Sequence, residues 1–157
     1  MKSAYAVATI GFVISVAWLS WIAWSLVFPA EGQAVTATPT VEFTIFGGEA
    51  GPKFGFALEG QQIASPGPPI KVKAGDIVKV TFKNSGSTAH AFAVVKENKD
   101  TAAVVFRGTV GSGSRPLVPG SQASAVFTAD KVGNYFYICP VPGHALLGMW
   151  GEFKVDG

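Results

Sequence analysis

One stretch of the chain, residues 139–149, holds most of the side chains that could bind a redox-active metal. It contains the only cysteine, Cys139, followed at even spacing by His144 and Met149, in a C-x4-H-x4-M pattern. A thiolate, an imidazole and a thioether are soft donors that together suit copper cycling between Cu(I) and Cu(II). Two prolines between the cysteine and the histidine restrict the backbone, so we expect this loop to be rigid.

The second histidine, His90, lies far upstream at the start of an apolar stretch. Two histidines and a cysteine with a weak axial methionine make the blue-copper arrangement. We therefore predict one mononuclear copper site with His90, Cys139, His144 and Met149 as ligands. Alone, each of these residues is more often part of the packing, and only their joint occurrence favours a metal. Zinc is the main alternative, but thioether is a poor zinc ligand and structural zinc sites favour several cysteines.

The residue counts exclude several classes of function. The net charge is +2 without a block of like charges, which argues against nucleic-acid binding. One cysteine cannot form an internal disulfide, nor bridge a dinuclear copper centre that needs two thiolates. Two histidines leave none for the second copper site of a multicopper oxidase or a copper nitrite reductase. We expect an electron carrier without a catalytic site of its own.

The elements that must position these donors are short strands. In residues 77–83, Val78, Val80 and Phe82 fall on one face and polar side chains on the other, as in a sheet with one wet side. The whole pattern predicts an all-β sandwich or barrel of about eight strands with Greek-key connections. We expect the strands within residues 41–46, 69–76, 77–83, 90–95, 102–106, 121–128, 135–138 and 150–155, with 54–58 as a possible addition, and a loop at 108–120.

The N-terminal segment has a different composition. Residues 4–28 carry no charged side chain, and roughly 20 apolar residues suffice to cross a bilayer. We predict a transmembrane anchor at 1–28, a flexible linker at 29–40 and a copper-binding domain at 41–157. A cleaved secretory signal is the alternative, although its apolar region would usually be shorter. Lys2 before the segment and Glu31 after it predict a cytoplasmic N-terminus and a copper domain on the extracytoplasmic side of the cell membrane.

Three motifs give the chain a family resemblance. They are Ile-x-Val-x-Ala-Gly-Asp-x-Val at 70–78, Leu-Val-Pro-Gly at 117–120, and Gly-Asn-Tyr-Phe-Tyr-Ile-Cys at 133–139 with the following Pro-Gly-His and Met. With them the chain resembles the cupredoxins, in particular the membrane-anchored mononuclear type 1 copper proteins such as sulfocyanin and auracyanin. The resemblance implies one copper bound by His90, Cys139 and His144, with Met149 axial. It also implies a periplasmic or pseudoperiplasmic electron shuttle in a respiratory or photosynthetic chain.

The chain departs from the cupredoxin pattern next to the first ligand. Many cupredoxins have Asn or Ser there, with a side chain that ties the ligand loops together, whereas this chain has Ala91. That tie is therefore expected to be missing. The backbone N–H groups of Ala91 and Val141 could still reach the cysteine sulfur.

The resemblance also implies that His144 is the ligand nearest to solvent. The residues of its own loop would then surround it with an uncharged apolar patch, which we expect to dock redox partners weakly. This predicted patch consists of Pro142, Gly143, Ala145, Leu146 and Leu147.

Three functions are compatible with these features. The first is a tethered carrier, with a quinol-oxidising complex or a cytochrome as donor and a terminal oxidase as acceptor. The second is an accessory copper subunit of a respiratory complex, held through its helix. Interfacial anchoring is the ordinary role of Trp24, whereas Trp18 with Gly11 and Ser15 could form a packing face. The third is copper delivery or storage, which would need exposed and labile metal.

Overall fold

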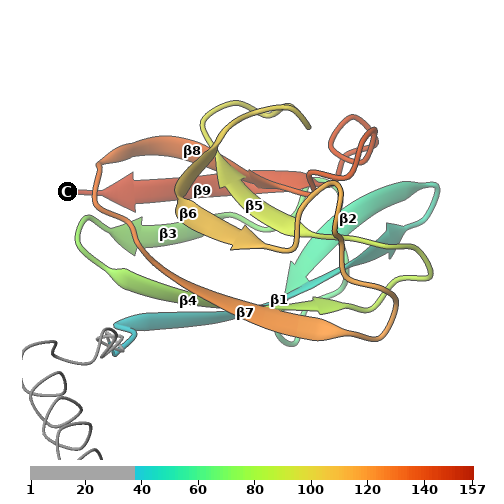
Figure 1. The fold of residues 1–157 in the computed structure, drawn as a ribbon, viewed down its shortest axis with the longest axis horizontal. Helices are drawn as coiled ribbons and strands as arrows, with labels where there is room; N and C mark the ends of the chain where they lie inside the picture. Colours follow the sequence, from blue (N-terminus) through green and yellow to red (C-terminus); the bar gives the residue numbers. More distant parts are fainter. Residues whose placement is uncertain (1–37) are drawn as a thin grey trace, which may run out of the picture. The chain divides into compact units, whose positions relative to one another are not determined.

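The structure, a computed structural model, describes residues 38–157 (Figure 1). The predicted anchor at 1–28 and most of the predicted linker at 29–40 lie outside the described residues. Within residues 38–157 there is no helix with the length and apolar character needed to cross a membrane.

Nine β-strands make up the regular structure of the described residues, which contain no α-helix. The strands form two sheets, of order β2-β1-β4-β7 and β3-β9-β8-β5-β6, stacked as two layers (Figure 1). The prediction of an all-β sandwich is thus confirmed, with nine strands rather than eight. Their bounds are β1 Val41–Ala50, β2 Lys53–Leu58, β3 Ile70–Lys73, β4 Ile77–Asn84, β5 Phe92–Val95, β6 Val104–Val110, β7 Gln122–Thr128, β8 Gly133–Ile138 and β9 Trp150–Asp156.

Two strand predictions need correction. The predicted strand 102–106 is β6, which continues to Val110 into the stretch expected to be a loop, because Phe92 of β5 pairs with Val110. His90 was predicted inside a strand, but β5 begins only at Phe92. His90 instead makes an isolated bridge with Leu117, with which it exchanges two backbone hydrogen bonds. This pairing fixes the backbone of His90 without placing it in a sheet.

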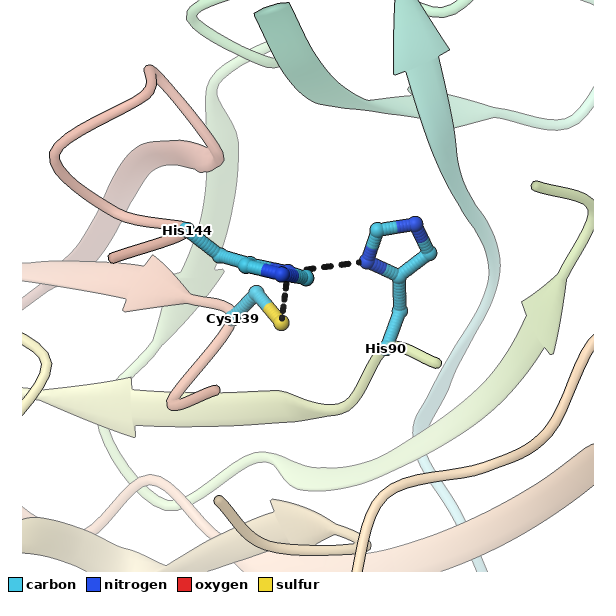
Figure 2. A group of neighbouring side chains, drawn as sticks. All are labelled: His90, Cys139 and His144. Carbon is cyan, nitrogen blue, oxygen red and sulfur yellow. Dashed lines mark hydrogen bonds between the residues drawn. The ribbon is translucent and has the colours of Figure 1, made fainter. Parts of the chain in front are cut away.

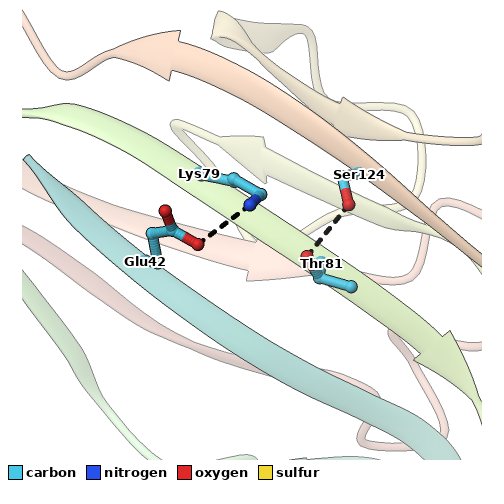
Figure 3. Close-up of polar contacts among 4 residues, drawn as sticks. All are labelled: Glu42, Lys79, Thr81 and Ser124. Carbon is cyan, nitrogen blue, oxygen red and sulfur yellow. Dashed lines mark hydrogen bonds and ion pairs between the residues drawn. The ribbon is translucent and has the colours of Figure 1, made fainter. Parts of the chain in front are cut away.

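The core lies between the two sheets. β4 alternates as predicted, with Val78, Val80 and Phe82 fully buried. Phe82 meets Phe56 of β2 edge to face, and Phe56 makes the same kind of contact with Tyr137 of β8, so aromatic rings link both layers. On the outer face of the first sheet, polar pairs bridge neighbouring strands: Lys79 with Glu42, and Thr81 with Ser124 (Figure 3).

The chain enters the sandwich at one end, and the loop that carries most of the predicted ligands lies at the other. At one end the described chain enters β1, where the N–H of Thr40 donates to the carbonyl of Ile77 and its hydroxyl to Asp76. At the other end lies the loop 139–149 between β8 and β9, red in Figure 1. Gly47, which lies beside Met149, is six positions after Val41 in β1, and an extended strand rises about 3.3 Å per residue. The donor-bearing end is therefore about 20 Å from the point where the chain enters the domain.

Candidate metal centre

Three of the predicted ligands meet at one point although they come from distant parts of the sequence. The donor atoms of His90, Cys139 and His144 all lie within 4.8 Å of one another. Nδ1 of His144 is 3.1 Å from Nδ1 of His90 and 3.5 Å from Sγ of Cys139 (Figure 2). The side chains thus converge on a common centre, with the ring of His144 between the other two donors.

The fourth predicted ligand, Met149, is held next to the other donors by its backbone. Its N–H donates to the carbonyl of His144, and its carbonyl accepts from the N–H of Cys139, each at 3.0 Å. The side chain is fully buried. The absence of a side chain at Gly47 makes room for it, because an added Cβ there would lie 2.9 Å from the Met149 methyl and 2.7 Å from the Phe82 ring.

The degree of burial separates His144 from the other donors. His90, Cys139 and Met149 have no exposed surface, whereas His144 is partly exposed. The expectation that His144 lies nearest to solvent is confirmed. In the predicted patch around it, Leu146 is 86% exposed and Leu147 49%, but Ala145 is buried against Ile138 and its neighbours. Ala145 therefore does not belong to the surface patch, since it faces inward from the loop.

Burial also controls the protonation of the three donors. It raises the pKa of the Cys139 thiol to about 11, although backbone N–H groups of Ala91 and Val141 lower it. Burial, assisted by repulsion from His144, lowers the pKa of His90 to about 4, against an opposing effect of Glu49. Burial likewise lowers the pKa of His144. Without a cation, the site therefore holds neutral imidazoles and a neutral thiol.

This donor set fits copper. Neutral imidazole is the metal-binding form of histidine, and a bound cation stabilises the thiolate that burial disfavours. The N–H of Ala91 donates to Sγ of Cys139 at 3.3 Å, as expected from the sequence, so the sulfur has a polar partner. A soft, buried set of two imidazoles, one thiolate and a nearby thioether suits copper better than zinc or a hard cation.

A loop tie that the sequence analysis missed comes from Asn84 at the end of β4. Its amide nitrogen donates to the carbonyls of Thr88 and Leu117, both at 2.8 Å, and its side-chain oxygen accepts from the N–H of Gly86. Asn84 thus joins the loop before His90 to the segment at Leu117, a tie separate from the side-chain tie that Ala91 lacks. An asparagine in a turn is common, and only the fold shows which carbonyls it reaches.

Other partners of the histidines were also missed. Oγ1 of Thr88 lies 3.2 Å from Nε2 of His90. The ring of Phe54 stacks on His144, with centroids 4.3 Å apart, and meets His90 edge to face at 5.1 Å. Phe54 was expected only as a strand residue, because its sequence neighbours give no sign of a distant histidine. Its ring orients both imidazoles and shields them from water.

Comparison with known proteins identifies a family for this chain. A family model described as the sulfocyanin (SoxE) domain matches residues 40–157. Auracyanin-A of Chloroflexus aurantiacus is 30% identical over 115 residues, which cover 62% of this chain and 70% of auracyanin-A. Rusticyanin of Acidithiobacillus ferrooxidans is 33% identical over 93 residues, 56% of this chain, and the matched part spans 50% of rusticyanin's length.

Two further matches concern the fold. A solved rusticyanin structure superposes with a TM-score of 0.59 at 22% identity, covering 76% of this chain and 79% of the other. The copper-containing nitrite reductase of Alcaligenes xylosoxydans xylosoxydans is 33% identical over 95 residues, 57% of this chain but only 27% of the reductase. The similarity to that enzyme is therefore confined to one part of it.

The family assignment follows from the match over residues 40–157, together with the buried donors at the loop end of a two-layer β-sandwich. The chain belongs to the sulfocyanin family of cupredoxins, which are blue copper proteins with one type 1 copper.

Proposed function

We propose that this chain is a membrane-tethered electron carrier that passes single electrons between components of a respiratory or photosynthetic chain, with a terminal oxidase as acceptor. The observation that carries the proposal is the contrast in exposure within the ligand set. Three of its members, His90, Cys139 and Met149, are buried, and only His144 extends to the surface. Copper held by the four residues would supply a one-electron Cu(I)/Cu(II) couple.

The surroundings of the ligands suit electron transfer. Thr88 and Phe54 contact the histidines directly, and Asn84 ties the loop before His90 to Leu117, the backbone partner of His90. Rings held in this way can keep nearly the same positions in both oxidation states, so little rearrangement opposes the transfer. The exposed edge of His144, beside Leu146 and Leu147, offers electrons a short route to a docked partner.

The same features argue against catalysis. A substrate would need an open position at the metal, and three of the four proposed ligands have no exposed surface. Within residues 38–157, one group of at least three histidine, cysteine or carboxylate side chains could hold a metal, namely His90, Cys139 and His144. The two histidines of the whole sequence are both in it. The chain would have to share a partner's second metal site to act like a nitrite reductase.

The proposed location rests on the N-terminal sequence and on the direction of β1. An uncharged segment at 4–28 would anchor the chain, with its N-terminus in the cytoplasm and the copper domain on the extracytoplasmic side. The chain enters the domain at Thr40, at the end opposite to the ligands. The proposed docking face lies at the ligand end of the sandwich.

The decisive experiment combines spectroscopy with turnover. Full-length protein loaded with copper and oxidised should show an intense thiolate-to-copper band and a one-copper EPR signal. After reduction it should be reoxidised by membranes that contain a terminal oxidase. A colourless protein after loading and oxidation would overturn the copper site, and a coloured protein that membranes never reoxidise would overturn the proposed acceptor.

Two further measurements separate the carrier from the other two functions. Purification in mild detergent should yield the chain without a respiratory complex, whereas stable co-purification would favour an accessory subunit. A strong Cu(I) chelator should remove the copper slowly, because the ligands are buried. Rapid loss would favour copper delivery or storage.

A further inference from the structure

Asp100, in the loop between β5 and β6, contacts the ligand loop from outside. One of its carboxylate oxygens accepts a hydrogen bond from the N–H of Gly143 at 2.6 Å, and the other accepts from the N–H of Ala145 at 3.0 Å. These two residues flank His144 in sequence. A single carboxylate therefore holds the backbone on both sides of the one ligand that reaches the surface.

The bonds to Asp100 complete the hydrogen bonding of a tightly turned segment. Within the loop, the N–H of His144 donates to the carbonyl of Val141, and that of Leu147 donates to the carbonyl of Gly143. Such turns leave N–H groups without partners at their start, as helices do. Asp100 accepts from two of these, and hydrogen bonds to an ionised acceptor are roughly twice as strong as neutral ones. Asp100 thus acts as a cap supplied from a distant loop.

The charge of Asp100 also reaches the donor atoms. Its carboxylate bonds the N–H groups of Gly143 and Ala145, so a negative charge lies next to His144 in the chain. A negative charge at this place favours Cu(II) over Cu(I), because the oxidised ion carries one more positive charge.

We propose that Asp100 is a positioning residue of the copper site: its carboxylate fixes the backbone around His144, and its charge lowers the reduction potential. This inference rests on the proposed function, but its first part concerns the polypeptide alone and can be tested without copper. It assigns to the β5–β6 loop a role that neither its sequence nor the ligand set indicates.

The two hydrogen bonds from Gly143 and Ala145 to Asp100, here called the clamp, are tested by amide hydrogen exchange in the copper-free protein. Asp100→Ala should accelerate exchange at Gly143 and Ala145 by roughly tenfold or more, as expected for loss of a hydrogen bond to a charged group. Asp100→Asn keeps one acceptor oxygen and should expose one of the two amides. Unchanged exchange at both amides in Asp100→Ala would overturn the clamp. If that variant does not fold, Asp100→Asn gives the same test, with wild-type exchange at both amides as the contrary result.

The charge effect is tested by the reduction potential of the copper-loaded protein. Asp100→Asn should raise the potential, and Asp100→Glu, which keeps the charge, should shift it less. The matched control is Glu42→Gln, which removes the same charge near the chain entry, where Glu42 pairs with Lys79 at 2.9 Å (Figure 3). The local effect would be overturned if Glu42→Gln raised the reduction potential as much as Asp100→Asn does. It would also be overturned if Asp100→Glu shifted the potential as much as Asp100→Asn. Failure of the wild type to bind copper would instead overturn the proposed function and leave the exchange result standing.

Discussion

Nδ1 of His90 lies 3.1 Å from Nδ1 of His144, although 54 residues separate the two histidines in the sequence. Two ring nitrogens at this distance can share one proton, or they can both face a cation. Thr88 lies beside His90, and the ring of Phe54 contacts both imidazoles. Residues outside the ligand set therefore contact both histidines.

The ligand assignment predicts different effects for the two histidines. Replacing Cys139 with Ser should abolish the intense visible band, because the thiolate is its source. In His144→Gly, added imidazole should restore the band, since the vacated position opens to solvent. In His90→Gly it should not, because that position is fully buried. Visible spectra with and without imidazole check this, and equal rescue of both variants would contradict the assignment.

The exposed part of the ligand loop predicts a docking face. Leu146, 86% exposed, projects beside His144, and a charge there should disturb weak apolar docking. Leu146→Asp should slow electron transfer to the partner by roughly fivefold or more without changing the copper spectrum. Val132→Asp, at a side chain 57% exposed in the turn before β8, is the control. Equal rates in wild type and Leu146→Asp, measured by stopped flow, would reject the docking face.

The low pKa of His90 predicts acid sensitivity of the copper-free protein. The unfolded chain takes up a proton at this residue near pH 6.5, whereas the folded protein does so only at about 4. This contribution to stability is complete above pH 6.5 and is lost as the pH falls toward 4. Between pH 7 and 5, above the range of most carboxylates, the unfolding free energy should fall by about 1 to 2 kcal/mol.

Urea unfolding at several pH values measures this loss. His90→Gln should have a smaller dependence on pH than the wild type, with the remainder due in part to His144, whose pKa is also lowered. The same slope in the variant and the wild type would show that another group is responsible.

The contact between Gly47 and Met149 predicts a steric effect on the site. A methyl group at position 47 would press on the Phe82 ring and on the methyl of Met149. Gly47→Ala should cost about 1 to 3 kcal/mol of stability by overpacking and should shift the visible band by displacing the proposed axial ligand. Gly157→Ala is the control, since its added carbon would meet nothing nearer than 3.7 Å. A stable Gly47→Ala protein with an unchanged spectrum would contradict the proposed role of Met149.

Much of the architecture could be read from local patterns. The alternation in β4 gave the buried face of that strand correctly, because a side-chain period of two needs no knowledge of partners. The extension of β6 to Val110 could not be read this way, since glycine and serine made that stretch resemble a loop. It is a strand because β5 offers a pairing edge. The backbone of His90 was misjudged for a similar reason, as its partner Leu117 is remote in sequence.

By itself, the sequence determined the chemistry of this protein: one cysteine, two histidines and a methionine at the right spacing can do little else together than hold a soft metal. Tertiary structure alone decided which residues outside the ligand set hold these side chains in place. Phe54 contacts a ligand directly, whereas Asn84 and Asp100 bond to segments beside the ligands. The contacting residues are about 30 to 90 positions apart in the sequence, for example 33 for Asn84 and Leu117. Such contacts depend on how the two sheets stack, and no local pattern of residues encodes that.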